Sequence, residues 1–143
     1  MIEISVEHLA VMKKCATAEY PHECCGLLLG QLRLDAGITV QRVVPARNLA
    51  EAGRLADRYV VDPRAILQAD KEARAAGMEI VGVYHSHPDH PARPSATDVE
   101  LAWGSCVYVI LSVIRGEAVE VIAWQLEGDR GVMMPVTITS LST

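Results

Sequence analysis

Residues 79–100 of this 143-residue chain, EIVGVYHSHPDHPARPSATDVE, decide the fold that the sequence predicts. The stretch opens on an almost wholly apolar run, which is typical of a strand buried on both faces in the middle of a covered sheet. A loop stiffened by three prolines follows, and Ser95 then stands where the N-cap of a helix is expected. We therefore predict a central strand whose carboxyl end leads through a short loop into a helix.

The segments on either side predict further helices and strands. Apolar residues at helical spacing, each set preceded by a capping residue, predict helices over 5–20 and 62–77. Pro63 at the first helical position and Gly77 just past the end support the second helix. Short β-type runs predict an antiparallel pair of strands before that helix and three strands after the third helix, at residues 24–32, 38–48, 106–114, 119–127 and 132–140. The predicted fold class is α/β, a mixed sheet flanked by helices.

Length and composition narrow the kinds of protein that this chain can be. A chain of this size buries roughly two thirds of its unfolded surface, and no repeat or linker divides it, so one domain over residues 1–143 is predicted. The apolar runs fall far short of the ~20 residues that span a membrane. The N-terminus shows no secretory signal, so the cytoplasm is expected. A net charge of −5 without clustered Lys or Arg argues against nucleic acid as a partner.

His85 and His87 are the first candidate ligands of a metal ion. They stand two residues apart at the end of the predicted strand, so both imidazoles point to the same side. Asp98 lies eleven residues after His87 and one helical turn past Ser95, and the proline-stiffened loop can bring that turn back over the histidines. Two imidazoles and one carboxylate suit a catalytic Zn²⁺, because three protein ligands leave the fourth tetrahedral position to water. The pattern indicates a hydrolase with one zinc per chain.

Each part of this pattern also has a simpler interpretation. Ser95 and Asp98 have the spacing of a capping box, in which the pair only caps a helix. Two histidines at a strand end are often merely solvated, and His90 is a rival third ligand in the same loop. The complete pattern is much rarer than either of its parts. H-x-H, seven residues, S, two residues and D arise together by chance in such a chain on the order of a few times in ten thousand.

The residues resemble those of the JAMM metallopeptidases, also called the MPN-plus family. That family's signature is an upstream Glu followed by H-S/T-H, seven residues, S, two residues and D. Here it is Glu23 followed by HSHPDHPARPSATD. The resemblance implies the JAMM/MPN core, a cytidine-deaminase-like fold. It also implies zinc on His85, His87 and Asp98, with Glu23 as the general base and Ser95 as a hydrogen-bond donor to the developing oxyanion.

The short chain bears on the substrate that the resemblance implies. Relatives that cleave polyubiquitin carry two insertions, for which 143 residues leave little room. The chain is more similar to the short bacterial members that act on ubiquitin-like sulfur-carrier proteins. Such an enzyme hydrolyses the bond after the C-terminal Gly-Gly and releases an amino acid such as cysteine or a short extension. A homodimer is compatible with this sequence.

Three other interpretations belong to different classes of protein. A metal-free MPN scaffold usually lacks one or more of the ligands, and all of them are present here. A DNA-repair-associated relative shares the H-x-H signature, but the segment around Glu23 fits the peptidases better. A zinc nucleoside deaminase, whose fold is similar, requires H-x-E and P-C-x-x-C, and neither occurs in the chain.

The cysteines are expected to be packing residues. Cys15, Cys24, Cys25 and Cys106 include a vicinal pair but no C-x-x-C, so they indicate neither a zinc ribbon nor a redox motif. Free buried thiols are the simplest interpretation in a reducing compartment. Because side chains alternate along a strand, one thiol of the vicinal pair should face the site and the other the core.

Overall fold

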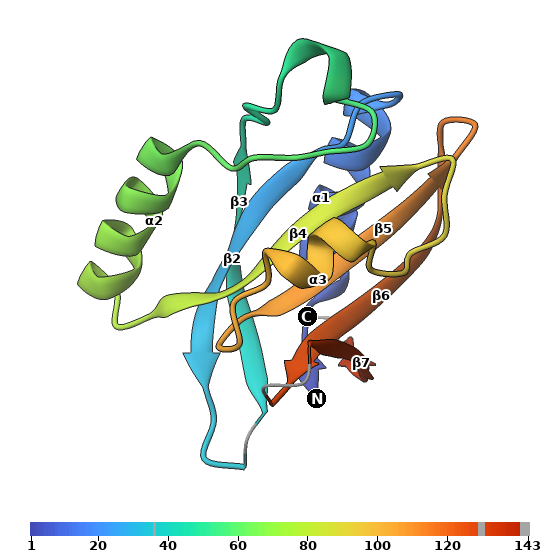
Figure 1. Cartoon of the computed structure of the whole chain (residues 1–143). Helices are drawn as coiled ribbons and strands as arrows, with labels where there is room; N and C mark the ends of the chain where they lie inside the picture. The colour runs from blue at the N-terminus through green and yellow to red at the C-terminus, as the bar shows by residue number, and fades with distance from the viewer. Residues whose placement is uncertain (36, 129–130, 141–143) are drawn as a thin grey trace.

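The computed structural model describes residues 1–35, 37–128 and 131–140 (Figure 1). Its strands are β1 Ile2–Glu3, β2 Cys25–Leu32, β3 Ile38–Ala46, β4 Glu79–Pro88, β5 Val107–Ile114, β6 Glu117–Glu127, β7 Val132–Val136 and β8 Ile138–Thr139. Its helices are α1 Val6–Glu19, the 3-10 turn η1 Ala52–Arg54, α2 Pro63–Ala75 and α3 Ala96–Glu100. The strands form one mixed sheet in the order β7-β6-β5-β4-β2-β3-β1-β8. The predicted α/β class is confirmed.

The predicted central strand, β4, lies in the middle of this sheet. It pairs antiparallel with β2 and parallel with β5, and its residues 81–88 are buried. Because parallel strands cannot be joined by a tight hairpin, the chain has to cross a face of the sheet between β4 and β5. The loop after β4 and the short helix α3 make this crossing, and α3 lies in front of the sheet in Figure 1. The crossing brings α3 back beside the end of β4.

Alternation of side chains divides the interior into two cores. Leu28 of β2 and Tyr84 of β4 pack on the side of α1, whereas Leu27 and Val83, their neighbours in the chain, pack on the side of α2. Each fully buried leucine contributes about 2 kcal/mol, so both cores stabilise the register of β4. The two histidines of β4 continue the row that Val83 begins, which places them on the side of α2.

The helices begin at the predicted capping residues. Ser5 Oγ accepts a hydrogen bond from the His8 amide at 3.1 Å, and the Asp62 carboxylate accepts one from the Arg64 amide at 2.9 Å. Gly77, just past the end of α2, has a φ of +72°, which a residue without a β-carbon adopts most easily.

The helices among the described residues lack the length and apolar character needed to span a lipid bilayer.

The last predicted strand is split in two. β7 pairs with β6 and β8 pairs with β1, so they lie at opposite ends of the strand order, although only Thr137 separates them. The Ile2 amide donates to the Thr137 carbonyl at 2.9 Å. This segment joins the two ends of the sheet. The sequence predicts one strand over 132–140 and none at β1, because strands of two residues carry no pattern of their own and form only by pairing.

Candidate functional site

The two histidines at the end of β4 form the floor of the candidate site. His85 and His87 lie on the same face of the strand, and their Nε2 atoms are 3.2 Å apart. The His85 ring is fully buried, and His87 is 9% exposed. The alternation of β4 thus places both imidazoles together, as the sequence predicts.

Asp98 of α3 completes a triangle of donor atoms with this pair. Its Oδ2 atom lies 3.1 Å from His87 Nε2 and 3.3 Å from His85 Nε2. Ligands bound at about 2.0 to 2.1 Å around a tetrahedral zinc are separated by roughly 3.3 Å. The three atoms therefore have the spacing and the chemistry of one face of a tetrahedral metal site.

The capping box predicted for Ser95 and Asp98 is also present. The Asp98 amide donates to Ser95 Oγ at 3.0 Å, and the Ser95 amide donates to Asp98 Oδ2 at 2.9 Å. The oxygen that caps the helix is the same oxygen that reaches both histidines. Capping and ligation are therefore not alternatives here, because the cap orients the carboxylate toward the imidazoles.

The other ring nitrogens of the two histidines have different surroundings. His87 Nδ1 lies 2.9 Å from the Pro91 carbonyl, which can only accept, so Nδ1 carries a hydrogen. Without a metal, a protonated His87 can also donate from Nε2 to Asp98, and loss of that second hydrogen would leave Nε2 for a metal. His85 Nδ1 is buried without a hydrogen-bond partner among the described residues. The His85 ring is instead stacked on Tyr59, with ring centroids 4.3 Å apart and planes 20° from parallel. Stacking and the strand therefore orient His85, whereas a hydrogen bond orients His87.

Glu23 lies beside the triangle, just before β2 begins. One of its carboxylate oxygens and the ring nitrogens of His85 and His87 all lie within 4.8 Å of one another, and the residue is 4% exposed. Its amide donates to the Leu55 carbonyl at 2.7 Å, and its carbonyl accepts from Asn48 Nδ2 at 3.0 Å. Glu23 and Asp98 are therefore both candidates to complete a metal site with the histidine pair, and Asp98 makes the closer contacts with the two rings.

The two carboxyl groups of the site have opposite proton affinities. Burial raises the pKa of Glu23 to about 8, with His87 opposing this shift and Asp98 adding to it. Burial also acts to raise the pKa of Asp98, but the hydrogen bonds from His85 and His87 outweigh it and hold that pKa well below its usual range. Burial lowers the pKa of His85, which favours the neutral imidazole that a metal requires. One carboxyl group is thus suited to bind a cation and the other to exchange a proton.

Comparison with known proteins assigns a family to this fold and site. Residues 5–127 match the family model of the prokaryotic homologs of the JAB domain. This chain belongs to that family. Over 105 residues it is 39% identical to a desampylase of Haloferax volcanii, covering 73% of this chain and 72% of that protein. Over 92 residues it is 37% identical to a probable TtuB-protein conjugate cleaving protease of Thermus thermophilus, covering 64% of this chain and 57% of that protein.

A solved structure has the same fold as this chain. A protein of Desulfitobacterium hafniense, determined in solution, superposes with a TM-score of 0.85 at 32% identity, covering 100% of this chain and 94% of that one. The predicted family and fold are confirmed by these matches. The predicted enzyme class, a peptidase of the JAMM type, is confirmed by the family and by the two named relatives.

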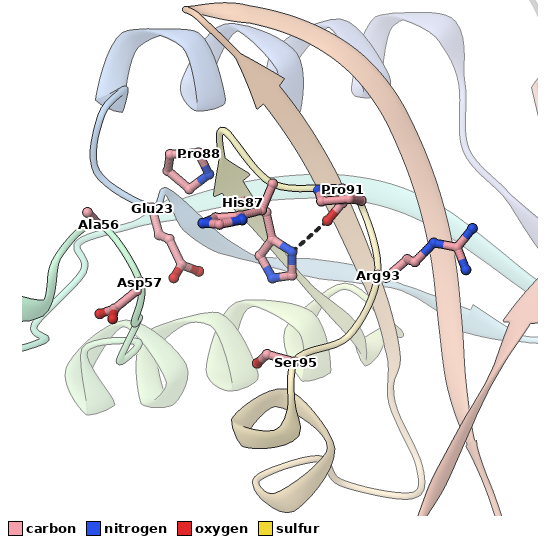
Figure 2. Close-up of a pocket in the computed structure, with 9 residues that line it drawn as sticks. Glu23, Ala56, Asp57, His87, Pro88, Pro91, Arg93 and Ser95 are labelled. Atoms are coloured by element: carbon pink, nitrogen blue, oxygen red, sulfur yellow. Dashed lines mark hydrogen bonds between the residues drawn. The ribbon is translucent and has the colours of Figure 1, made fainter.

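A cavity of about 320 Å³ opens beside the site of this JAB-family chain. Figure 2 shows the Glu23 carboxylate next to the His87 ring, with Ser95 below them. The cavity is also lined by Pro88, the last residue of β4, and by three residues of the loop between β4 and α3, which are His90, Pro91 and Arg93. A substrate bond near the donor triangle can therefore be flanked by a group of moderate size.

The loop that carries Pro91 is held to the sheet by side chains of β5 and β6. Ser112 Oγ donates to the His90 carbonyl at 2.6 Å, and Trp124 Nε1 donates to the Ala92 carbonyl at 3.0 Å. The His90 side chain is exposed, and among the described residues no hydrogen bond joins its imidazole to the histidines of β4. The structure therefore brings Asp98, rather than His90, to the histidine pair.

Some residues around the site could not be predicted from the sequence. Tyr59 and Asn48 are examples, because each contacts residues that are far away in the chain. The sequence marks Tyr59 only as an aromatic residue just ahead of a helix cap and Asn48 only as an asparagine after a strand, and neither feature points to the site.

The vicinal cysteines alternate as predicted. Cys24 packs with the α1 core, and Cys25 pairs with His85 on the neighbouring strand. Burial raises the pKa of the Cys25 thiol to about 12, in keeping with a packing role.

Proposed function

We propose that this chain is a zinc-dependent peptidase that hydrolyses the bond after the C-terminal Gly-Gly of a ubiquitin-like sulfur-carrier protein. Zinc is held by His85, His87 and Asp98, and the released piece is an amino acid such as cysteine or a short extension. The observation that carries the proposal is the triangle of donor atoms, with sides of 3.1 to 3.3 Å, beside the buried Glu23. The names of the relatives, a desampylase and a protease that cleaves TtuB-protein conjugates, support a protein conjugate as the substrate.

Glu23 is the general base in this proposal. Zinc at the triangle would supply a water of pKa ~7 and polarise the carbonyl of the scissile bond. The Glu23 carboxylate accepts a proton from the attacking water and delivers it to the amine that leaves. Burial suits this task, because it raises the pKa of Glu23 to about 8, close enough to neutrality for the group both to accept and to release a proton.

Ser95 donates a hydrogen bond to the substrate oxygen as that oxygen becomes negative. Its Oγ accepts a hydrogen bond from the Asp98 amide, so the hydroxyl hydrogen is free to point into the cavity that Ser95 lines. The capping box fixes the serine before the substrate arrives. Removing one such donor from other hydrolases lowers the rate by roughly 10²- to 10³-fold.

The Gly-Gly tail suits the depth of this site. The histidine pair is almost inaccessible, with His85 fully buried and His87 9% exposed. A backbone without β-carbons approaches such a floor more closely than one with side chains. The cavity of about 320 Å³ next to His87 then accommodates the residue that is released.

The test measures zinc and cleavage in the same preparations. Protein purified without added metal is analysed for zinc, and a carrier protein ending in Gly-Gly-Cys is incubated with it and analysed by mass spectrometry. We expect about one zinc per chain in the wild type and in Glu23→Gln, because the base is not a ligand. We expect cleavage to fall by roughly 10²- to 10⁴-fold in the variant.

Two results contradict parts of the proposal. Loss of zinc in Glu23→Gln would show that Glu23 is a ligand and not the base. A wild type without zinc, even after reconstitution, and without cleavage of the carrier would favour the metal-free scaffold.

A further inference from the structure

Asn48, the single asparagine of the chain, uses every hydrogen-bonding group of its side chain. Nδ2 donates to the carbonyls of Glu23 and Arg58, each at 3.0 Å. Oδ1 accepts from the amides of Ala50 at 2.9 Å and Val60 at 3.0 Å. An amide offers two donor hydrogens and one oxygen with two lone pairs, so this side chain is fully satisfied.

These four bonds connect two parts of the site that are distant in the chain. One partner, Glu23, carries the carboxylate beside the donor triangle. Two of the other three, Arg58 and Val60, flank Tyr59, whose ring is stacked on His85. One side chain thus links the main chain under the carboxylate to the segment that orients a candidate ligand.

The main chain at Glu23 depends on this link because Glu23 lies outside the strand ladder. β2 begins at Cys25, and the main-chain groups of Glu23 bond to Leu55 and Asn48 instead of to a neighbouring strand. Of these two bonds, the one from Asn48 is made by a side chain and can be removed by substitution. The bond to Leu55 joins two main-chain groups, so no side-chain substitution removes it directly.

We infer that Asn48 is a positioning residue, which fixes the Glu23 carboxylate and the Tyr59 ring relative to the histidine pair. This inference rests on the proposed role of Glu23 as the general base. A displacement of about 1 Å at a reacting group can lower the rate by roughly 10²-fold. Loss of the Asn48 bonds should therefore reduce turnover without removing any group that touches the substrate or the metal.

Two substitutions test the link, and a third is a matched control. Asn48→Asp has the same size and keeps the acceptors but cannot donate to the two carbonyls. Asn48→Ala removes the same donors without adding a charge near Glu23. Gln31→Glu is the control, because Gln31 Nε2 also donates to a carbonyl, that of Gly77 at 3.1 Å, at the far end of β2.

The kinetic result separates positioning from binding. We expect both Asn48 variants to keep about one zinc per chain and the wild-type KM, with kcat lower by roughly 10- to 100-fold. Gln31→Glu should have the wild-type kcat. Wild-type kcat in both Asn48 variants would overturn the inference, and so would loss of zinc in either of them, since the link would then serve the metal ligands.

Amide hydrogen exchange on the metal-free proteins tests the same link without any substrate. We expect exchange about tenfold faster at residues 22–24 and 55–61 in the Asn48 variants, and unchanged exchange in β5. Equal exchange in all proteins, or faster exchange throughout the sheet, would overturn the inference. If the wild type cleaves no carrier protein, the proposed function fails, and the exchange result still decides whether Asn48 holds these two segments.

Discussion

The candidate site has two halves that are built in different ways. The ligand half, from His85 to Asp98, is one continuous stretch of fourteen residues. The base half brings together Glu23, Asn48 and Tyr59, which come from three separate segments. A strand end, a proline-rich loop and a capping box supply all the residues of the first half. The second requires β2 and the chain that follows β3 to pack together, so tertiary contacts matter more for the placement of the proposed base than for that of the proposed metal ligands.

The halves differ in their electrostatics for the same reason. Asp98 accepts hydrogen bonds within its own stretch, and these hold its pKa low although burial acts against them. Glu23 has no such donor to its carboxylate among the described residues, and burial therefore raises its pKa. Two carboxyl groups whose environments separate their pKa values in this way are typical of sites that divide binding from proton transfer.

The largest effect is expected in the ligand half, on replacing Asp98 with Asn. Asn can keep the capping bond from the Ser95 amide but offers no carboxylate to a metal, so the variant separates the cap from the ligand. We expect elemental analysis to find little zinc and mass spectrometry to find no cleavage. In the metal-free proteins the free energy of unfolding should also fall, by more than about 1 kcal/mol at neutral pH, because a carboxylate whose pKa is held low in the folded state stabilises that state.

His90→Ala is the matched control for that variant. His90 is exposed in the same loop, so its substitution should leave about one zinc per chain. Full zinc in Asp98→Asn combined with loss of zinc in His90→Ala would show that His90 is the third ligand and that Asp98 only caps α3.

The contrast between the halves also explains what the sequence could predict. The H-x-H spacing at a strand end and the S-x-x-D spacing at a helix start each specify a direction for the side chains, so the ligand half could be derived from its residues. Glu23 is one of 18 acidic residues, and only the family resemblance distinguished it from the others. The partners of Asn48 are main-chain groups, which every residue has, so no sequence pattern could predict these hydrogen bonds.

The fold could be predicted to a similar extent. The central strand, the caps of the helices and the mixed sheet could be predicted from hydrophobic periodicity and from the residues that begin and end helices. The extension of the sheet by β1 and β8 could not be predicted, because these strands have two residues each and depend on pairing between the two ends of the chain.

A smaller effect is expected in the base half, on the pH dependence of stability in the metal-free protein. Burial raises the pKa of Glu23 from 4.5 to about 8. A group that binds its proton more tightly in the folded state stabilises the fold at low pH, and this contribution falls as the pH rises through that interval. Glu23→Gln removes this titration, so the free energy of unfolding of the variant should fall less steeply with rising pH than that of the wild type. The two slopes should differ by at most about 1.4 kcal/mol per pH unit.

Urea unfolding with a chelator at several pH values measures this difference. The other titrating groups are present in both proteins, so their contributions largely cancel in the comparison. Parallel pH dependences for the wild type and Glu23→Gln would contradict the raised pKa and would place the Glu23 carboxylate in contact with water.

The smallest effect tests whether the ligand half is as self-contained as its sequence suggests. Trp124 Nε1 in β6 donates to the Ala92 carbonyl, so part of the support of the loop comes from a distant strand. Trp124→Phe keeps the aromatic packing and removes this donor, and we expect the free energy of unfolding to fall by about 1 kcal/mol with zinc retained. Trp103→Phe is the control, because Trp103 is 53% exposed and its indole makes no hydrogen bond among the described residues. Loss of zinc in Trp124→Phe alone would show that the loop cannot hold the ligands by itself, and the ligand half would then depend on tertiary structure as much as the base half does.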